Sequence, residues 1–304
     1  MNTEINYSFV IPHHNTPDLL QRLVDSIPQR GDIEIIVVDD NSDVDKKANV
    51  SRSDVKIIYI DKEHTKGAGR ARNIGMDAAT GKWLVFADAD DFFDSKSLYE
   101  AMVEYVDADA DVIVFPIRVV DSDTLQEGHW RDQWFNTLFY SKKSPKQKLL
   151  GTAACWSKFI RKDIVDRNNI RFEEIRYSND QWFSANVAIL SDKIVCDGNH
   201  KIYNLTYVAH SLTRNRGIDA FDCRFNAELR MWNLLSSHGQ TTERSTYTRF
   251  LLWASDFGTS KVVETYRRLI KMNVPNTTVS PWHKVKQLSF LYFVLRSVIS
   301  KKAK

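Results

Sequence analysis

The chain has 304 residues, with 42 Lys and Arg against 39 Asp and Glu, and hydrophobic residues make up 43% of it. The small net charge of +3 excludes a protein built around polyanion binding, and the mixed composition excludes a disordered chain or a coiled coil. A chain of this length forms one α/β domain of about 200–250 residues with an appendage, or two domains of about 150.

Short β-rich runs alternate with helical patterns over the first 120 residues, as in a parallel sheet with crossover helices. A helix is expected from about Pro17, with Thr16 as its cap, and another follows the Gly-rich turn at Gly67 and stops near Gly81. A third helix is expected near 95–105. Strands are expected at 7–12, 33–40, 55–61, 82–87 and 111–120. The sequence therefore predicts a doubly wound α/β half that is nearly complete by Val120.

The later part of the chain carries a different pattern. Residues 121–150 are polar and aromatic without a clear period, which suits a loop or short antiparallel pieces. A strand or turn with a short helix, a further helix and two strands are expected between 153 and 210, and helices from about Asp219 to Lys271 and from Pro281 to Ser300. We predict an α/β domain over 1–215 and a helical C-terminal extension over 216–304.

Localisation signals are few. Cys155, Cys196 and Cys223 lie far apart, form no CxxC pair and leave an odd thiol, which favours a reducing compartment. No stretch reaches the 18 or so apolar residues that span a bilayer, and the N-terminus lacks the basic region and cleavage site of a secretion signal. We expect a cytoplasmic protein.

Acidic side chains follow two strands of the predicted sheet. Asp39 and Asp40 end the second strand, and Asp88, Asp90 and Asp91 end the fourth. The carboxyl ends of parallel strands line the ligand crevice of such a sheet, and carboxylates gathered there repel one another unless a cation lies between them. Oxygen ligands favour Mg²⁺ or Mn²⁺. Helix capping and turn formation are the simpler explanation for a single acidic group of this kind. Two such groups at adjacent strand ends favour a metal site.

The residues that follow these strands resemble the family 2 glycosyltransferases, which are inverting enzymes of the GT-A fold. The most specific block combines A-R-N-x-G with a strand that ends in D-x-D-D. The resemblance covers about residues 7–210. The matching blocks are FVIPHHN (9–15), IIVVDDNSD (35–43), the Gly-rich block 67–93 and, more loosely, WSKFIRKDIVDRNNIRF (156–172) and SNDQWFSA (178–185).

The resemblance implies a nucleotide site with a metal beside it. Pro12 and Asp40 would line the base pocket, with the carboxylate accepting from a uracil N3–H, and Arg72 and Asn73 would lie beside the nucleotide. Mn²⁺ or Mg²⁺ is the implied cofactor. The implied metal residues are the pair Asp88 and Asp90, of which Asp90 makes the direct contact, and His210 as a phosphate or metal contact; Asp91 would address the donor sugar.

The resemblance also implies the reaction. Asp180 occupies the place of the base that removes the acceptor hydroxyl proton while nucleoside diphosphate leaves from the opposite face. Relatives commonly carry Glu-Asp here, whereas this chain reads Asn179-Asp180. The Q-x-x-R-W block of processive synthases is missing, because Phe183 and Ser184 follow Gln181 and Trp182. We expect transfer of one sugar per encounter from a UDP-sugar to a saccharide hydroxyl.

Three other classes fit less well. The Gly-rich block has neither the spacing of a dinucleotide fingerprint nor its later acid. A sugar-1-phosphate nucleotidyltransferase would need a Gly-rich first loop where this chain has IPHHN. A non-catalytic nucleotide-sugar-binding module stays open, and binding without turnover would identify it.

Positive charge gathers at the C-terminus. Residues 261–304 hold ten Lys and Arg and one acid, Glu264. Apolar residues between Trp282 and Ile299 follow helical spacing with basic flanks, as in a helix that lies on an anionic membrane surface. The alternative is a helix docked on its own core or on a second subunit, as in a homodimer. Membrane contact through 282–304 would suit a lipid-linked acceptor of surface-polysaccharide assembly on the inner face of the membrane, and nucleic acid is not an expected partner.

Overall fold

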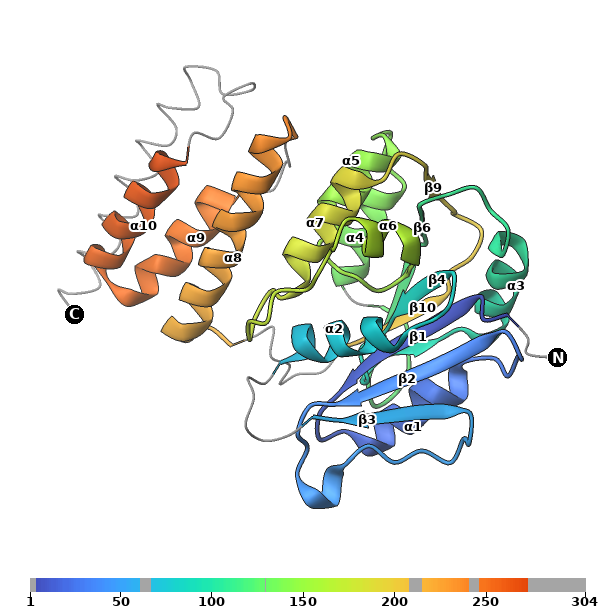
Figure 1. Cartoon of the computed structure of the whole chain (residues 1–304). Helices are drawn as coiled ribbons and strands as arrows, with labels where there is room; N and C mark the ends of the chain where they lie inside the picture. The colour runs from blue at the N-terminus through green and yellow to red at the C-terminus, as the bar shows by residue number, and fades with distance from the viewer. Residues whose placement is uncertain (1–3, 61–66, 129, 208–214, 241–245, 273–304) are drawn as a thin grey trace. The chain divides into compact units, whose positions relative to one another are not determined.

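The computed structural model describes residues 4–60, 67–128, 130–207, 215–240 and 246–272 (Figure 1). The chain divides into two compact units, residues 1–211 and 212–304, and each is described by itself. The first unit is a mixed α/β structure and the second is helical, which confirms the predicted fold class.

A seven-stranded sheet forms the centre of the first unit. β1 to β4 run parallel, β8 is antiparallel to its neighbours β4 and β6, and β9 is parallel to β6. The carboxyl ends of β1, β2 and β4 therefore meet at one edge. The strand order is β3 (Val55–Tyr59), β2 (Ile33–Asp39), β1 (Tyr7–His13), β4 (Trp83–Phe86), β8 (Lys158–Arg161), β6 (Val112–Val114) and β9 (Ile194–Cys196).

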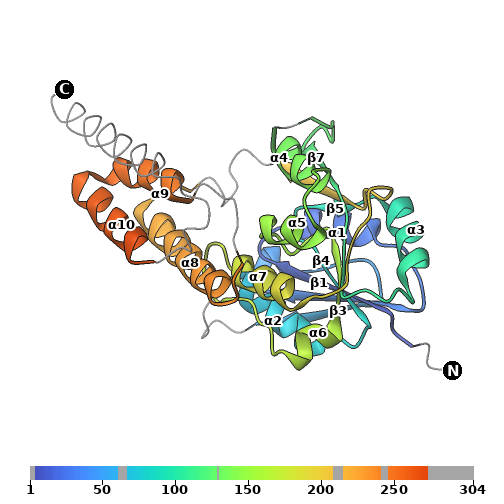
Figure 2. The ribbon, with the colours of Figure 1, turned by 90° about the horizontal axis from the view of Figure 1, so that it is seen from above.

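Alternation along the strands separates the two faces of the sheet. Phe9 and Ile11 of β1 join a buried cluster with α1 (Pro17–Ser26) and α3 (Ser95–Tyr105). Val10 faces the other way, toward α2 (Ala68–Ala78), where a Cβ on Gly75 would lie 2.4 Å from the Val10 Cγ1. Figure 2 shows α2 and α1 on opposite sides of these strands. Gly75 thus lets α2 pack directly on the sheet.

A second, three-stranded sheet has the order β5 (Phe92–Phe93), β10 (Tyr203–Tyr207) and β7 (Ile117–Asp121). The single strand expected over 111–120 is wrong, because it divides at Pro116 into β6 of the large sheet and β7 of the small one. Proline lacks the N–H that a continuous ladder requires. The small sheet brings β10 alongside β5, which directly follows the acids after β4.

The expectation of a loop or antiparallel pieces over 121–150 is confirmed as far as 128, where an antiparallel bridge joins Val120 and Glu127. It is wrong beyond that, because α4 (Trp130–Phe139) and α5 (Pro145–Gly151) form there. Ser144 caps α5 and shares a capping box with Gln147, and Pro145 occupies its first turn. The Ser144 cap and Pro145 are both visible in the sequence as start signals of α5. However, α4 and α5 are each too short to show a clear helical period of apolar residues.

An aromatic cluster fixes α7 (Asp180–Leu190) on the face of the sheet that also carries α2. Phe86 at the end of β4 contacts Phe172 and Phe183 edge to face at 5.1 and 5.4 Å between centroids, and the latter two stack at 3.9 Å. Phe172 follows α6 (Lys162–Arg167) and Phe183 lies in the first turn of α7. The beginning of α7 is thereby held close to the end of β4.

The second unit contains α8 (Ile218–Ser237), α9 (Thr246–Ala254) and α10 (Thr259–Lys271). Phe221, Phe225 and Phe250 form its buried centre with Trp253. The helix predicted from Pro281 to Ser300 lies outside the described residues, as does the proposed membrane segment. Within the described ranges, no helix combines the length and apolar character needed to cross a bilayer.

Candidate active site

The candidate site lies where parallel strands end. In register, His13 of β1 stands opposite Asp39 of β2, and Val10 of β1 stands opposite Phe86 of β4. Asp40 and the acids from Asp88 onward come directly after these pairs. Because parallel strands expose their final residues along one crevice, the two acidic groups lie at the same edge, as the sequence predicts.

Asp40 presents one carboxylate oxygen that no other residue of the described ranges engages. Its Oδ2 accepts from the Gly67 amide at 2.6 Å, and its amide donates to the His13 carbonyl at 2.8 Å. Its Oδ1 is buried and has no hydrogen-bond partner among the described residues. Gly67 has φ of 145°, a conformation that favours glycine. A buried acceptor left open in this way suits a ligand N–H.

Asp39, next to it, is a structural acid. It accepts from the amides of Ser42 at 2.8 Å and Ala48 at 2.6 Å, and its Oδ2 lies 3.1 Å from the His13 Nδ1. Burial alone would raise the pKa of Asp39, but the hydrogen bonds from the two amides hold it below its usual range. This buried carboxylate fixes the loop after β2, and both of its oxygens are engaged by the protein.

Pro12 occupies a place in β1 where a missing N–H is harmless. It stands opposite Val38 of β2, and the pairing of β1 with β4 ends two residues earlier, at Val10. On the β4 side no ladder hydrogen bond is lost. The half-buried ring therefore lies near the strand edge that carries Asp40.

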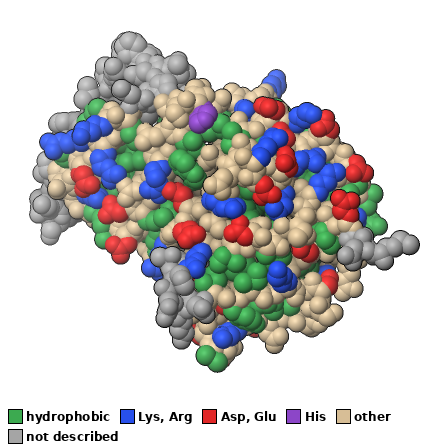
Figure 3. All heavy atoms as spheres, in the orientation of Figure 1, with side chains coloured by type: hydrophobic (Ala, Val, Ile, Leu, Met, Phe, Trp, Pro, Cys, Tyr) green, Lys and Arg blue, Asp and Glu red, His purple; other side chains and the backbone are tan. Residues whose placement is uncertain are grey.

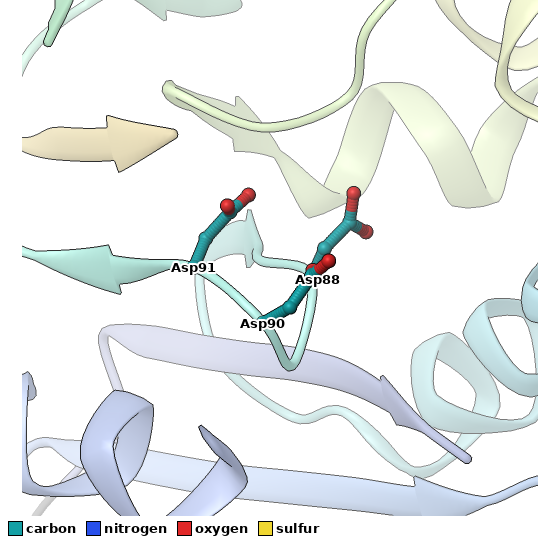
Figure 4. Close-up of side chains that lie close together, drawn as sticks. All are labelled: Asp88, Asp90 and Asp91. Atoms are coloured by element: carbon teal, nitrogen blue, oxygen red, sulfur yellow. The ribbon is translucent and has the colours of Figure 1, made fainter. Parts of the chain in front are cut away.

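Asp88, Asp90 and Asp91 form a cluster in which carboxylate oxygens lie within 4.8 Å of one another. Burial first, and the charge of Asp88 second, raise the pKa of Asp90 to about 6. Figure 4 shows the side chains of Asp88 and Asp90 together, with the carboxylate of Asp91 standing to one side of them. Hard oxygen donors whose charges repel one another fit a divalent cation such as Mn²⁺ or Mg²⁺.

The carboxylate of Asp91 is already engaged. Its Oδ2 accepts from the Tyr203 hydroxyl at 2.5 Å and its Oδ1 accepts from the Thr206 amide at 2.7 Å, and the residue is 1% exposed. Burial, followed by the charges of Asp90 and Asp88, raises its pKa well above the usual value. The resemblance implies a contact with the donor sugar, whereas in this arrangement both oxygens bind β10.

Arg72 of α2 joins two parts of the site. Its guanidinium donates to Asp88 through Nη2 and to the Asn179 Oδ1 through Nη1 at 2.8 Å, and it lies over the Phe172 ring at 5.3 Å. Burial alone would lower the pKa of Arg72, but the nearby acidic groups of Cys155, Asp88 and Asp180 raise it. Arg72 thus connects the acids after β4 with the start of α7.

The side-chain amide of Asn73 is occupied by the backbone of Phe172. Its Nδ2 donates to the Phe172 carbonyl at 3.0 Å and its Oδ1 accepts from the Phe172 amide at 2.9 Å. Gly69 lets this segment come close to α2, since a Cβ at Gly69 would lie 2.1 Å from the Glu173 carbonyl oxygen. Together they seat the segment that leads to Asp180 against α2.

Asp180 is the first residue of α7, where a carboxylate is favoured by the positive end of the helix dipole. It is half-buried, and its charge acts to raise the pKa values of Arg72 and Cys155 and to oppose the lowering of the Lys158 pKa by burial. Arg72 reaches both Asp88 and the neighbour of Asp180, so the acids after β4 and the acid of α7 belong to one region.

Two residues at this site carried no readable signal in the sequence. Lys158 of β8 is 1% exposed, donates to the Ala154 carbonyl at 2.7 Å, and has its pKa lowered to about 8 by burial. Burial raises the pKa of the Cys155 thiol to about 12, so this cysteine is a poor nucleophile. His210 lies outside the described residues.

Two curated relatives are named as glycosyltransferases. GlyA of Streptococcus pneumoniae is 23% identical over 293 residues, which cover 89% of this chain and 38% of that glycosyltransferase. TarS of Staphylococcus aureus, a poly(ribitol-phosphate) β-N-acetylglucosaminyltransferase, is 23% identical over 211 residues, which cover 62% of this chain and 35% of TarS. The chain therefore spans little more than a third of these relatives.

Solved structures share the fold. The crystal structure of TarS 1–349 in complex with UDP-GlcNAc matches with a TM-score of 0.61 and 16% identity, covering 97% of this chain and 81% of that one. The mannosyltransferase PcManGT from Pyrobaculum calidifontis, solved with GDP-Man and Mn²⁺, matches with a TM-score of 0.53 and 12% identity, covering 98% and 87%. The predicted GT-A fold is confirmed.

The family assignment rests on the region that carries the site. Residues 8–168 match Glycosyl transferase family 2, which is more than half of the chain. That range includes Asp40, the helix of Arg72 and the acids after β4. The chain therefore belongs to the family 2 glycosyltransferases.

Proposed function

We propose that this protein transfers one sugar from a nucleoside diphosphate sugar, a UDP-sugar, to a saccharide hydroxyl with inversion at the anomeric carbon. The observation that carries the proposal is the contact of Arg72 with both Asp88 and Asn179, because it joins a donor side to the acid of α7. Family membership and the complex of TarS with UDP-GlcNAc support the donor class.

The nucleotide end of the site would be formed by Asp40, Pro12 and Arg72. The open Oδ1 of Asp40 is suited to accept the N3–H of uracil, and the ring of Pro12 provides an apolar wall. Arg72 places a positive charge at the acids after β4, where the diphosphate would lie. Asn73, whose amide is occupied by Phe172, would support the site through α2 without contacting the nucleotide.

Asp88 and Asp90 would hold Mn²⁺ or Mg²⁺ beside the diphosphate. When bound, the cation supplies Lewis-acid stabilisation of the charge that builds on the leaving group. Both acids are half-buried, burial raises the pKa of Asp90, and Asp88 is oriented by Arg72. His210, which the resemblance associates with phosphate or metal, stays a prediction.

Asp180 would take the proton from the acceptor hydroxyl during a single displacement, so no covalent intermediate is needed. Asn179, in the place of the usual glutamate, is neutral and accepts from Arg72. The charge of Arg72 is therefore matched by Asp88 without a second carboxylate at position 179.

A lipid-linked saccharide is the proposed acceptor, with the protein held at the inner face of the membrane through 282–304. A Campylobacter jejuni relative that is 36% identical over 90 residues, covering 28% of this chain, is named as a glucosyltransferase of an undecaprenol-linked glycan. The basic segment 261–304 supports the membrane contact, since each basic residue near an anionic surface contributes about 1 kcal/mol. A homodimer stays open.

The first test uses Asp180→Asn. Turnover of the UDP-sugar that gives product should fall by about 10²-fold or more, because general-base catalysis is lost. Binding of UDP with Mn²⁺, measured by calorimetry, should stay within about twofold of wild type. The matched control is Asp163→Asn, an exposed acid in the first turn of α6. Normal transfer by Asp180→Asn would refute the assignment of the base.

The second test uses Asp90→Ala and a panel of nucleoside diphosphate sugars with and without Mn²⁺. Metal-dependent turnover should be abolished, because one of the two proposed metal ligands is removed. Activity that survives chelation in the wild-type protein would contradict the metal assignment. Tight donor binding by the wild-type protein without turnover across donors and acceptors would favour the non-catalytic binding module.

A further inference from the structure

Tyr203 of β10 touches both ends of the acidic loop after β4. Its hydroxyl accepts from the Asp88 amide at 3.1 Å and donates to the Asp91 Oδ2 at 2.5 Å. The side chain is fully buried, stacks on Trp156 at 5.5 Å with the ring planes 4° apart, and meets Phe93 edge to face at 5.4 Å. Its hydroxyl therefore has one place that it can occupy.

Two further contacts hold the backbone of the same loop. The Asp90 carbonyl accepts from the Thr206 Oγ1 at 2.6 Å and from the Arg22 Nη2 at 2.6 Å. The Thr206 Oγ1 also lies 3.1 Å from the Asp91 Oδ1. The loop is thus held by the Asp88 amide, the Asp90 carbonyl and the Asp91 carboxylate. None of these contacts uses the carboxylate of Asp88 or of Asp90.

The division of roles within the acidic cluster follows from these contacts. Asp91 is buried and both of its oxygens accept hydrogen bonds from β10, whereas Asp88 and Asp90 are only half-buried. Figure 4 shows the carboxylate of Asp91 apart from the side chains of Asp88 and Asp90, which lie together. Proximity alone would make all three aspartates candidate metal ligands. Because β10 already binds both oxygens of Asp91, Asp88 and Asp90 are the two candidates that remain.

We propose that Tyr203, assisted by Thr206, is a positioning residue that anchors the loop through Asp91, so that Asp88 and Asp90 alone face the cation. The proposal deepens the proposed function and rests on it for the identity of that cation. Groups that orient metal ligands without touching the metal typically change metal affinity by about 10–100-fold when they are removed. Loss of the Tyr203 hydroxyl should therefore weaken metal binding by Asp88 and Asp90, although it does not contact their carboxylates.

The test compares Tyr203→Phe with Tyr7→Phe in the full-length protein. Tyr7 is the matched control, because it is also fully buried and its hydroxyl donates to the Met102 carbonyl at 2.7 Å, away from the acidic loop. Tyr203→Phe loses two buried hydrogen bonds at the acidic loop, and Tyr7→Phe loses one away from it. Electron paramagnetic resonance of free Mn²⁺, with the metal alone as the probe, then measures affinity.

Tyr203→Phe should bind Mn²⁺ about 10-fold more weakly than wild type, and Tyr7→Phe should stay within about twofold. Thr206→Val, which keeps its backbone amide, should weaken binding severalfold and serves if Tyr203→Phe does not fold. Wild-type affinity in both β10 variants, or an equal loss in Tyr7→Phe, would overturn the positioning role.

Hydrogen exchange separates this inference from the proposed function. The peptide that spans 87–93 contains the Asp88 amide, which donates to Tyr203, so it should exchange severalfold faster in Tyr203→Phe and unchanged in Tyr7→Phe. No metal is needed for this measurement. If the wild-type protein bound no Mn²⁺, the proposed cation would be wrong, but hydrogen exchange would still decide whether Tyr203 holds the loop. Unchanged exchange in Tyr203→Phe would reject the anchoring role of Tyr203.

Discussion

His13 shows how a buried side chain supports the strand ends beside Asp40, where we propose that the nucleotide binds. Its Nε2 accepts from the Thr16 amide at 3.2 Å, so its Nδ1 carries the proton that is directed at Asp39. The neutral ring therefore satisfies both neighbours. Burial lowers the pKa of His13, although the hydrogen bond with Asp39 opposes this.

The lowered pKa of His13 predicts how stability depends on pH. Unfolded histidine titrates near pH 6.5, so its contribution is complete above that value and is lost as the pH falls toward the lower pKa of the folded state. The free energy of unfolding, measured with urea at several pH values between about 7.5 and 5.5, should fall more in wild type than in His13→Asn. Equal slopes in the two proteins would contradict a buried neutral His13.

Two neighbouring pairs of acids illustrate what a sequence can indicate at the scale of single residues. The strand-end pattern predicts that Asp40 and Asp88 share one edge, because both follow parallel strands. It does not reveal that Asp39 and Asp91 turn inward, since their partners come from the Ser42 loop and from β10. Partners more than a hundred residues away, such as Tyr203, leave no pattern near the motif.

At the scale of elements, the Gly-rich block serves packing. Gly69 admits the Glu173 carbonyl and Gly75 admits the Val10 side chain, so α2 lies close both to the segment before α7 and to the sheet. The sequence predicts the helix and its start, but it does not predict this second use of the glycines. Similarly, the division of the strand at Pro116 depends on which sheet each half joins.

Gly69→Ala tests that packing. The added methyl would meet a backbone oxygen at 2.1 Å, so α2 and the segment before α7 must separate, at a cost of about 1–3 kcal/mol in the free energy of unfolding. Turnover should fall with it, because Arg72 and Asn179 move apart. Gly198→Ala is the control, since its nearest neighbour would be 3.5 Å away. Equal stability of the two variants, measured by urea unfolding, would refute this packing role.

At the scale of the whole molecule, charge is distributed unevenly along the chain. On the face shown in Figure 3, basic and acidic side chains are interspersed. The excess of positive charge belongs to 261–304 in the sequence, and most of those residues lie beyond the described part of the second unit. The C-terminal segment is therefore the region from which membrane contact is expected.

Deletion of 282–304 tests this expectation. Removing the segment takes away five Lys and Arg residues between Lys284 and Lys302, and Lys304. Binding to vesicles that contain anionic lipid, measured by sedimentation at low and high salt, should fall by about 10-fold or more, because each basic residue near the surface contributes about 1 kcal/mol. Unchanged binding would favour a helix docked on protein.

The most direct test of the account is a crystal structure of the protein with UDP and Mn²⁺. We expect uracil against Asp40, the cation on Asp88 and Asp90 beside the diphosphate, and Asp180 facing the same cavity from the start of α7. A complex in which Asp40, Asp90 and Asp180 line different cavities would contradict the proposed reaction.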